Sequence, residues 1–129
     1  MKSLSTIFLL SAIISFTIAT EFVYSATFKC SIPELSEWCI KLKYIEKDFD
    51  SRPNVLSTQS HICFYFPTQT IGNYAQSITR TNNFGKHILF VNVTHNCQAN
   101  KEFKEFEYEL PRVRKGDRIV HIDFTVELS

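Results

Sequence analysis

The side chains with the most chemistry in this chain of 129 residues are its four cysteines, its four histidines and one glycosylation sequon. The cysteines are Cys30, Cys39, Cys63 and Cys97, and their spacing differs from the paired C-x-x-C pattern of a structural zinc site. An even number of cysteines in a short chain is typical of disulfide bonds when the chain enters an oxidising compartment. We therefore expect two disulfides, for which the sequence alone allows three pairings.

The histidines do not form a metal-binding pattern. His87 and His95 share one face of an expected strand, but eight residues at about 3.3 Å each place them about 26 Å apart. His61 and His121 approach other histidines only through the tertiary fold. We expect imidazoles scattered over the surface and the core edge, with neither a metal ion nor another cofactor.

Catalytic motifs are missing from the sequence. It has no G-x-S-x-G nucleophile elbow, and the pairing of all four cysteines leaves no thiol nucleophile. Its three glycines are far apart and form no phosphate-binding loop. A formal net charge of +1 gives no reason to expect nucleic acid as a partner. We expect a protein that is not an enzyme.

The only N-x-[ST] sequon is Asn92-Val93-Thr94, within the expected strand His87–His95. Strand parity places Asn92 on the face away from the core, together with Ile88 and Phe90. We predict Asn92 as a glycosylation site and Ile88 and Phe90 as a candidate contact face.

The N-terminal segment is typical of a secretory signal peptide. Lys2 supplies a positive start, and Ile7–Ala19 is an uncharged apolar run, too short to span a bilayer. Small residues favour cleavage after Ala19, with Ser25 as a later alternative. Residues 1–19 are thus an expected signal and 20–129 a single domain of 110 residues, with 13 basic and 13 acidic side chains. No second apolar run of spanning length follows, so we expect a secreted protein without a transmembrane segment.

The expected domain reads as strands almost throughout. In Arg118–Leu128, apolar residues alternate with polar ones, which is typical of a strand with one face on a core and one in water. Residues 68–85 are the least determined part, because they fit either a short helix or a long loop. The other expected strands are Trp38–Glu46, Cys63–Phe66, His87–His95 and Glu105–Leu110. We predict an all-β, two-sheet sandwich of about seven strands, stabilised by disulfides.

Strand parity favours one of the three disulfide pairings. Apolar neighbours that point into the core leave Cys39 and Cys63 pointing outward from their strands. Two outward cysteines on neighbouring strands can be bridged, whereas an inward and an outward one cannot be bridged without distortion. We predict Cys39–Cys63, which leaves Cys30–Cys97 as the second pair.

Aromatic residues are unusually frequent, with 12 phenylalanines in the chain. On parity, we expect core positions for Phe28, Phe64, Phe66, Phe106, Tyr108 and Phe124. We expect loops or outer faces for Phe49, Phe84, Phe90 and Phe103.

Five short segments resemble the nematode transthyretin-like family. They are Phe28–Cys30, Ile40–Asp48 (the family's "VKVKLYEKD"), Phe90–Cys97 ("LKIYHDC"), Phe106–Pro111 ("FEIPIP") and Thr125–Leu128 ("TINL"). The resemblance implies a prealbumin-type β-sandwich in a small secreted protein. It also implies a binding role outside the cell, such as bridging cell-surface ligands, signalling or host interaction.

The chain departs from this family at two places. The family's T-D-x-x-G-x-F signature is replaced by Thr58–Phe64, and Cys39 and Cys63 look like additions. A related hydrolase ends in Tyr-Arg-Gly-Ser, which this chain lacks. We therefore expect a non-enzymatic protein that binds an extracellular protein or cell-surface ligand. The alternative is an oligomeric carrier of a small hydrophobic ligand, such as a lipid or hormone.

Overall fold

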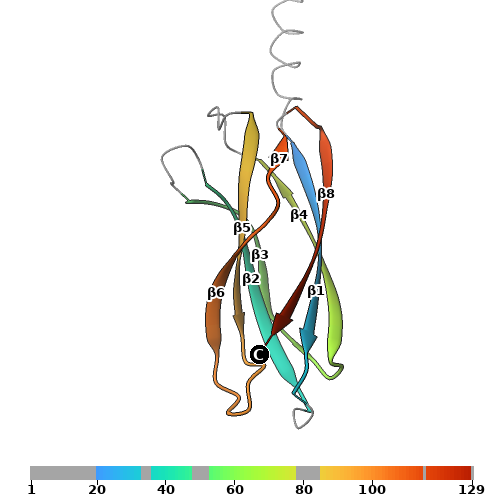
Figure 1. Cartoon of the computed structure of the whole chain (residues 1–129), viewed down its shortest axis with the longest axis vertical. Helices are drawn as coiled ribbons and strands as arrows, with labels where there is room; N and C mark the ends of the chain where they lie inside the picture. The colour runs from blue at the N-terminus through green and yellow to red at the C-terminus, as the bar shows by residue number, and fades with distance from the viewer. Residues whose placement is uncertain (1–19, 33–35, 48–52, 78–84, 115, 129) are drawn as a thin grey trace, which may run out of the picture.

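The computed structural model describes residues 20–32, 36–47, 53–77, 85–114 and 116–128. The expected signal segment, 1–19, lies outside the described residues. All regular structure in the described ranges is β-strand (Figure 1). The strands are β1 (Glu21–Cys30), β2 (Trp38–Lys47), β3 (Pro53–Phe64), β4 (Thr68–Gln76), β5 (Lys86–His95), β6 (Lys104–Glu109), β7 (Val113–Arg114) and β8 (Ile119–Leu128).

The strands form two sheets that face each other along the long axis of the molecule (Figure 1). One sheet has the order β4-β1-β8, and the other has the order β3-β2-β5-β6, with the short β7 paired to β5. Neighbouring strands are antiparallel except β1 and β8, which run parallel. The expected all-β, two-sheet sandwich is confirmed, with seven long strands and the two-residue β7.

Alternating burial explains why these segments are strands. In β5 every second residue, from His87 to His95, is buried, and the residues between them are half-buried. β8 likewise alternates exposed positions with buried ones such as Ile122 and Phe124. A period of two is the signature of a strand that covers a core with one face.

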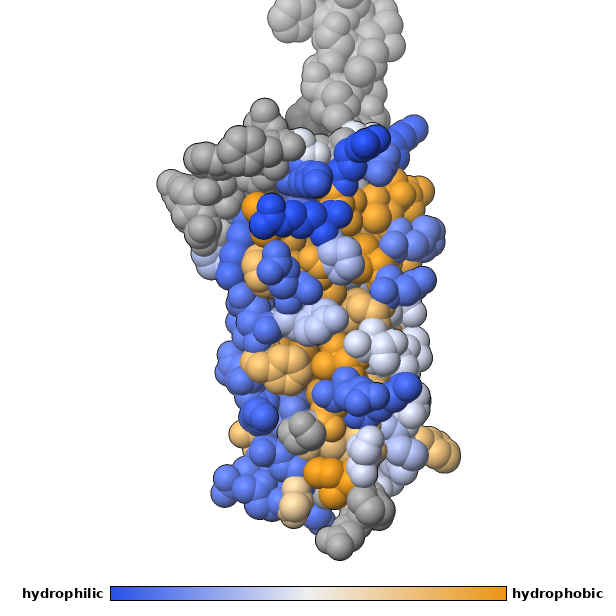
Figure 2. Space-filling model, in the orientation of Figure 1, coloured by the Kyte–Doolittle hydropathy of each residue, from blue (hydrophilic) through white to orange (hydrophobic). Residues whose placement is uncertain are grey.

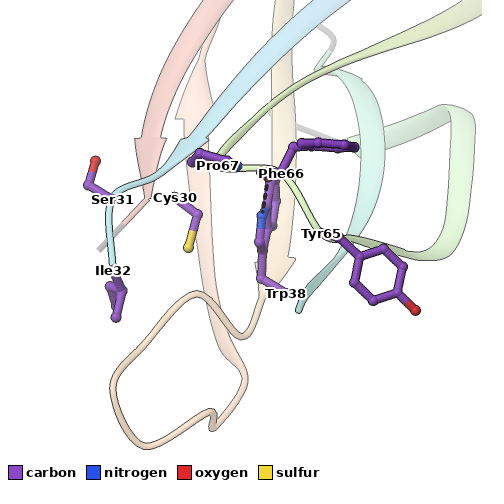
Figure 3. Close-up of a pocket in the computed structure, with 7 residues that line it drawn as sticks. All are labelled: Cys30, Ser31, Ile32, Trp38, Tyr65, Phe66 and Pro67. Carbon is purple, nitrogen blue, oxygen red and sulfur yellow. Dashed lines mark hydrogen bonds between the residues drawn. The ribbon is translucent and has the colours of Figure 1, made fainter. Parts of the chain in front are cut away.

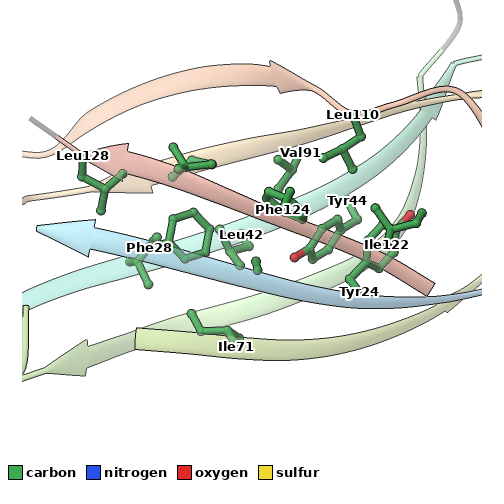
Figure 4. Close-up of a cluster of buried hydrophobic side chains, with 14 of the residues drawn as sticks. Tyr24, Phe28, Leu42, Tyr44, Ile71, Val91, Leu110, Ile122, Phe124 and Leu128 are labelled. Carbon is green, nitrogen blue, oxygen red and sulfur yellow. The ribbon is translucent and has the colours of Figure 1, made fainter. Parts of the chain in front are cut away.

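The core lies between the sheets and is rich in aromatic rings (Figure 4). Tyr24 of β1 and Tyr44 of β2 stack with their ring centroids 3.9 Å apart, and Phe28 meets Phe124 edge to face. Burial raises the pKa of both tyrosines above their ordinary value of 10. Their hydroxyls have no hydrogen-bond partner among the described residues.

The pairing of β2 with β3 contains an irregularity. Ile40 lies opposite Ile62, but Leu42 lies opposite Gln59, so β3 holds one extra residue between these pairs. An extra residue of this kind is a β-bulge, which bends its strand and re-aims nearby side chains. His61 lies in this stretch of β3.

Two disulfides join the strands, in the pairs that parity favoured. Cys39 and Cys63 lie directly opposite each other on β2 and β3, with Cα atoms 4.0 Å apart. Cys30 at the end of β1 is bonded to Cys97 after β5, which ties the two sheets together. Cys39 is buried but lies outside the core cluster, as expected for a residue on the outer face of β2.

Three expectations about individual segments change. Thr68–Gln76, within the least determined part of the sequence, is the long strand β4. Phe66 was expected in the core but is 70% exposed, because β3 ends at Phe64 and strand parity no longer applies in the turn. Tyr108 was also expected in the core but is 37% exposed, because β6 is the edge of its sheet and has no neighbour beyond it.

Candidate functional site

A pocket lies at one end of the sandwich, where the β1–β2 connection meets the turn between β3 and β4 (Figure 3). It has a volume of about 330 Å³. Its lining residues are mostly apolar: Cys30, Ser31, Ile32, Trp38, Tyr65, Phe66 and Pro67. We call this surface the aromatic end.

Hydrogen bonds hold the turn of the aromatic end in place. The indole Nε1 of Trp38 donates to the backbone oxygen of Phe66 at 2.8 Å (Figure 3). The ring of Trp38 also packs on that of Phe64. The backbone N–H of Cys30 donates to the oxygen of Pro67 at 2.7 Å. The turn is thus anchored to both β1 and β2, so its shape is set before any ligand arrives.

Two aromatic side chains stand out from this anchored turn. Tyr65 is 72% exposed and Phe66 is 70% exposed, whereas Trp38 behind them is almost fully buried. Large aromatic side chains that face water on a rigid support are the residues that most often dominate protein interfaces. Sequence reasoning placed Phe66 in the core and did not single out Tyr65.

The opposite end of the sandwich contains a buried polar cluster. Oε1 of Glu46 accepts a hydrogen bond from the Ser77 hydroxyl at 2.7 Å, and its Oε2 lies 2.5 Å from Nδ1 of His87. The other ring nitrogen of His87, Nε2, lies 3.2 Å from Oγ1 of Thr20. Phe22 packs edge to face on the imidazole. We call Thr20, Glu46, Ser77 and His87 the polar end.

The order carboxylate, imidazole, hydroxyl in the polar end is that of a hydrolase triad. A nucleophile must meet its substrate, however, and Thr20 is only 3% exposed. Glu46 is fully buried with both oxygens bonded, as a buried charge requires. These contacts join the start of β1, the end of β2, the end of β4 and the start of β5, so they organise one end of the sandwich.

The sequence contained a signal for this cluster that motif reasoning missed. Glu46 shares the inward parity of Ile40 and Tyr44, so it is a charged residue at a core position. A charge at such a position must find a partner, and His87 has the same inward parity in β5. Pairing the two required knowledge that β2 and β5 are neighbours.

The predicted contact face lies on the outer side of the five-stranded sheet. Ile88, Phe90 and Asn92 are half-buried there, and the ammonium of Lys47 sits 4.0 Å from the ring centroid of Phe90. Nδ2 of Asn92 donates to Glu105 on β6 at 3.0 Å. These three residues therefore expose less apolar surface than the aromatic end.

A second apolar surface runs between the open edges of the two sheets. Figure 2 shows a column of apolar side chains along the long axis, flanked by polar ones, where β6 and β8 lie in Figure 1. Tyr108 of β6 covers part of it, with its ring stacked on Phe124 at 6.0 Å between centroids. The Tyr108 ring thus lies between the edge strands β6 and β8 and remains partly exposed.

One histidine lies beside cysteines. The side-chain ligand atoms of Cys39, His61 and Cys63 are all within 4.8 Å of one another. The expectation of scattered imidazoles missed this group, because the neighbouring strand brings Cys39 to it. His95, by contrast, is buried, and its Nδ1 accepts from the N–H of Cys97 at 3.0 Å.

Comparison of the chain with protein-family models, with curated proteins and with solved structures finds no match. In the ranges that the structure describes, no helix is long and apolar enough to cross a membrane.

Proposed function

We propose that this protein is a secreted, non-enzymatic binding protein that contacts an extracellular protein ligand through its aromatic end. The observation that carries the proposal is the exposure of Tyr65 and Phe66, 72% and 70%, on an anchored turn beside the pocket. Burying two such rings on a partner removes a large apolar area from water at little conformational cost, since the turn is already ordered.

The size and shape of the pocket favour a protein partner. A volume of about 330 Å³ is at the lower end of the range for small-molecule sites, which is about 300–1,000 Å³. The exposed rings of Tyr65 and Phe66 lie on its rim, where they would contact a surface that extends beyond the pocket. An apolar side chain of the partner in the pocket, with Tyr65 and Phe66 packed around it, gives the clustered anchors typical of interface hot spots.

Extracellular action is supported by the covalent structure. Two disulfides suit an oxidising compartment, and the apolar run at residues 7–19 has the length of a signal peptide core. The resemblance to transthyretin-like proteins agrees with this assignment. The nearly neutral charge supports a protein ligand over nucleic acid.

The test is capture of a ligand from extracellular and membrane extracts by the oxidised, glycosylation-competent protein. The double variant Tyr65→Ser, Phe66→Ser removes the exposed rings, and Ile119→Ser is the matched control. Ile119 is 58% exposed at the other end of the sandwich. We expect a protein captured by the wild type and the control to be lost with the double variant. Equal capture by all three would contradict the proposal.

The alternative is a carrier of a small hydrophobic ligand. The space between the sheets is filled by core side chains, so a transthyretin-type carrier would hold its ligand in a channel between subunits. Such a carrier must be a stable oligomer. Sedimentation at micromolar concentration discriminates the two: a monomer supports the binding protein, and a tetramer that takes up a fluorescent fatty acid supports the carrier.

A further inference from the structure

A group of metal-ligand side chains lies on the outer face of β2 and β3. His61 and Cys63 are two residues apart on β3, beside the β-bulge, and Cys39 lies directly opposite Cys63 on β2. The imidazole nitrogen and the two sulfurs are within 4.8 Å of one another. Oε1 of Glu37 lies 3.6 Å from Sγ of Cys39. Two sulfurs and one imidazole thus converge from two paired strands, and the Glu37 carboxylate, just before β2, lies near one of the sulfurs.

We propose that Cys39, Cys63 and His61 form a latent zinc site that opens when the Cys39–Cys63 disulfide is reduced. In the oxidised protein the two sulfurs are bonded to each other and cannot act as thiolate ligands. Reduction provides two thiols beside an imidazole. Zn²⁺ prefers cysteine sulfur and histidine nitrogen in a tetrahedral arrangement, and Glu37 or a water molecule completes the set.

The geometry requires only a small change. Zinc–sulfur bonds of about 2.3 Å and zinc–nitrogen bonds of about 2.0 Å place tetrahedral ligand atoms about 3.3–3.8 Å apart. The sulfurs are now bonded to each other, and the whole group spans at most 4.8 Å. Rotation of the cysteine side chains after reduction moves the sulfurs apart toward the spacing that zinc requires. The backbone pairing of β2 with β3 already holds the strands in place.

The two disulfides differ in solvent accessibility, and this difference favours reduction of Cys39–Cys63 over Cys30–Cys97. Cys63 is half-buried and His61 is exposed, so a reductant reaches this pair from the outer face of the sheet. Cys97 is fully buried in the core cluster between the sheets, and Cys30 is only 3% exposed, although it lines the pocket of the aromatic end. An attacking thiolate needs access to a sulfur, so the exposed face reacts first.

The chemistry balances with a small dithiol as the reductant. The dithiol transfers two electrons and two protons to the Cys39–Cys63 bond and becomes a cyclic disulfide, which leaves two protein thiols. Zinc binding then displaces the thiol protons to the buffer. The metal replaces the covalent link between β2 and β3, directly before the turn that bears Tyr65 and Phe66.

The experiment first reduces the protein with a small dithiol until two thiols are titrated, and then removes the dithiol, which would itself chelate the metal. Co²⁺ is added as a spectroscopic probe, and then Zn²⁺. We expect a thiolate-to-cobalt charge-transfer band at one ion per chain, displaced by one equivalent of zinc. His61→Ala should weaken the zinc affinity at least tenfold, whereas the matched control His121→Ala, on the exposed face of β8, should leave it unchanged.

Three results would overturn the proposal. They are the absence of a stoichiometric thiolate–cobalt band, the same affinity in His61→Ala as in the wild type, and retention of the site in Cys39→Ser, Cys63→Ser. If reduction releases four thiols, the variant Cys30→Ala, Cys97→Ala isolates the second pair, with circular dichroism to verify its β-structure. Binding by this variant supports the site, and no binding by the folded variant rejects it.

Discussion

The strand ends are joined by different kinds of contact at the two ends of the sandwich: buried hydrogen bonds at the polar end and disulfides at the aromatic end. At the polar end, a fully buried carboxylate, Glu46, joins strand ends through hydrogen bonds to Ser77 and His87. At the aromatic end, two disulfides and the Trp38 indole join the strand ends, and the aromatic side chains beyond them face water.

Because of this difference, we expect the polar end to matter mainly for stability and the aromatic end mainly for binding. A buried charge is tolerated only while its partners stay in place, so the polar end cannot change without a large loss of stability. The aromatic end is cross-linked covalently behind its turn, so its exposed rings contribute little to folding and are free to contact a ligand. Substitutions at the polar end should therefore lower the free energy of unfolding, whereas substitutions of the exposed rings should weaken ligand binding.

The largest effect should come from removal of the start of β1. A chain that begins at Thr20 keeps Phe22 and Tyr24 in the core, whereas a chain that begins at Ala26 loses both and the Thr20 contact with His87. We expect the first to fold and the second to remain unfolded by circular dichroism. If the protein is secreted as proposed, N-terminal sequencing of the mature chain should begin at Thr20. A folded chain that starts at Ala26 would show that the polar end is dispensable.

Glu46→Ala should be the most damaging single substitution at the polar end. It leaves His87 and Ser77 without their partner in a buried site, and loss of one member of such a pair costs about 3–5 kcal/mol. The control is Glu107→Ala, which removes a more exposed ion pair with Lys47 and should cost about 1 kcal/mol or less. Urea unfolding of both variants gives the two free energies. If both variants lost the same free energy of unfolding, the prediction that the buried Glu46 contributes more than the exposed Glu107 would be wrong.

The two disulfides at the other end should contribute unequally. Cys30–Cys97 closes a separation of 67 residues and Cys39–Cys63 one of 24. In the chain-entropy description these correspond to about 4.4 and about 3.4 kcal/mol, so the Cys→Ala pairs should differ by about 1 kcal/mol. Thermal unfolding of the two double variants measures the difference. If removal of Cys39–Cys63 cost more stability than removal of Cys30–Cys97, contacts in the folded state rather than chain entropy would determine which disulfide contributes more.

The smallest effect should be a pH dependence from His95. Burial, with a further contribution from Lys104, lowers the pKa of His95 below its ordinary value of 6.5. The unfolded chain therefore takes up a proton before the folded one, so stability is complete above pH 6.5 and falls as the pH decreases below it. Protonation would also remove the Nδ1 acceptor for Cys97 N–H. Unfolding free energies at pH 7.5 and 5.5 should differ less in His95→Asn, and an unchanged difference would exclude His95 as the cause.

Local patterns were sufficient for β2, β5, β6 and β8 and for the cysteine pairs, but not for β4 or for most of β3. Alternation in β5 and β8 is strong because one face must leave water, and this information is contained in neighbouring residues. The parity that placed Cys39 and Cys63 on outer faces depends on the same local rule. The rule fails where a strand ends or lies at a sheet edge, as Phe66 and Tyr108 demonstrate.

The sequence by itself determined the all-β class, the inward and outward faces of β2, β5 and β8, and two disulfides with their preferred pairing. Only the tertiary structure decided which strands are neighbours, and hence that Glu46 meets His87, that His61 lies beside Cys39, and that Tyr65 and Phe66 project beside a pocket. The physical reason is the range of the interactions. Alternating burial can be recognised from consecutive residues, whereas contacts between residues distant in sequence depend on how the whole chain packs.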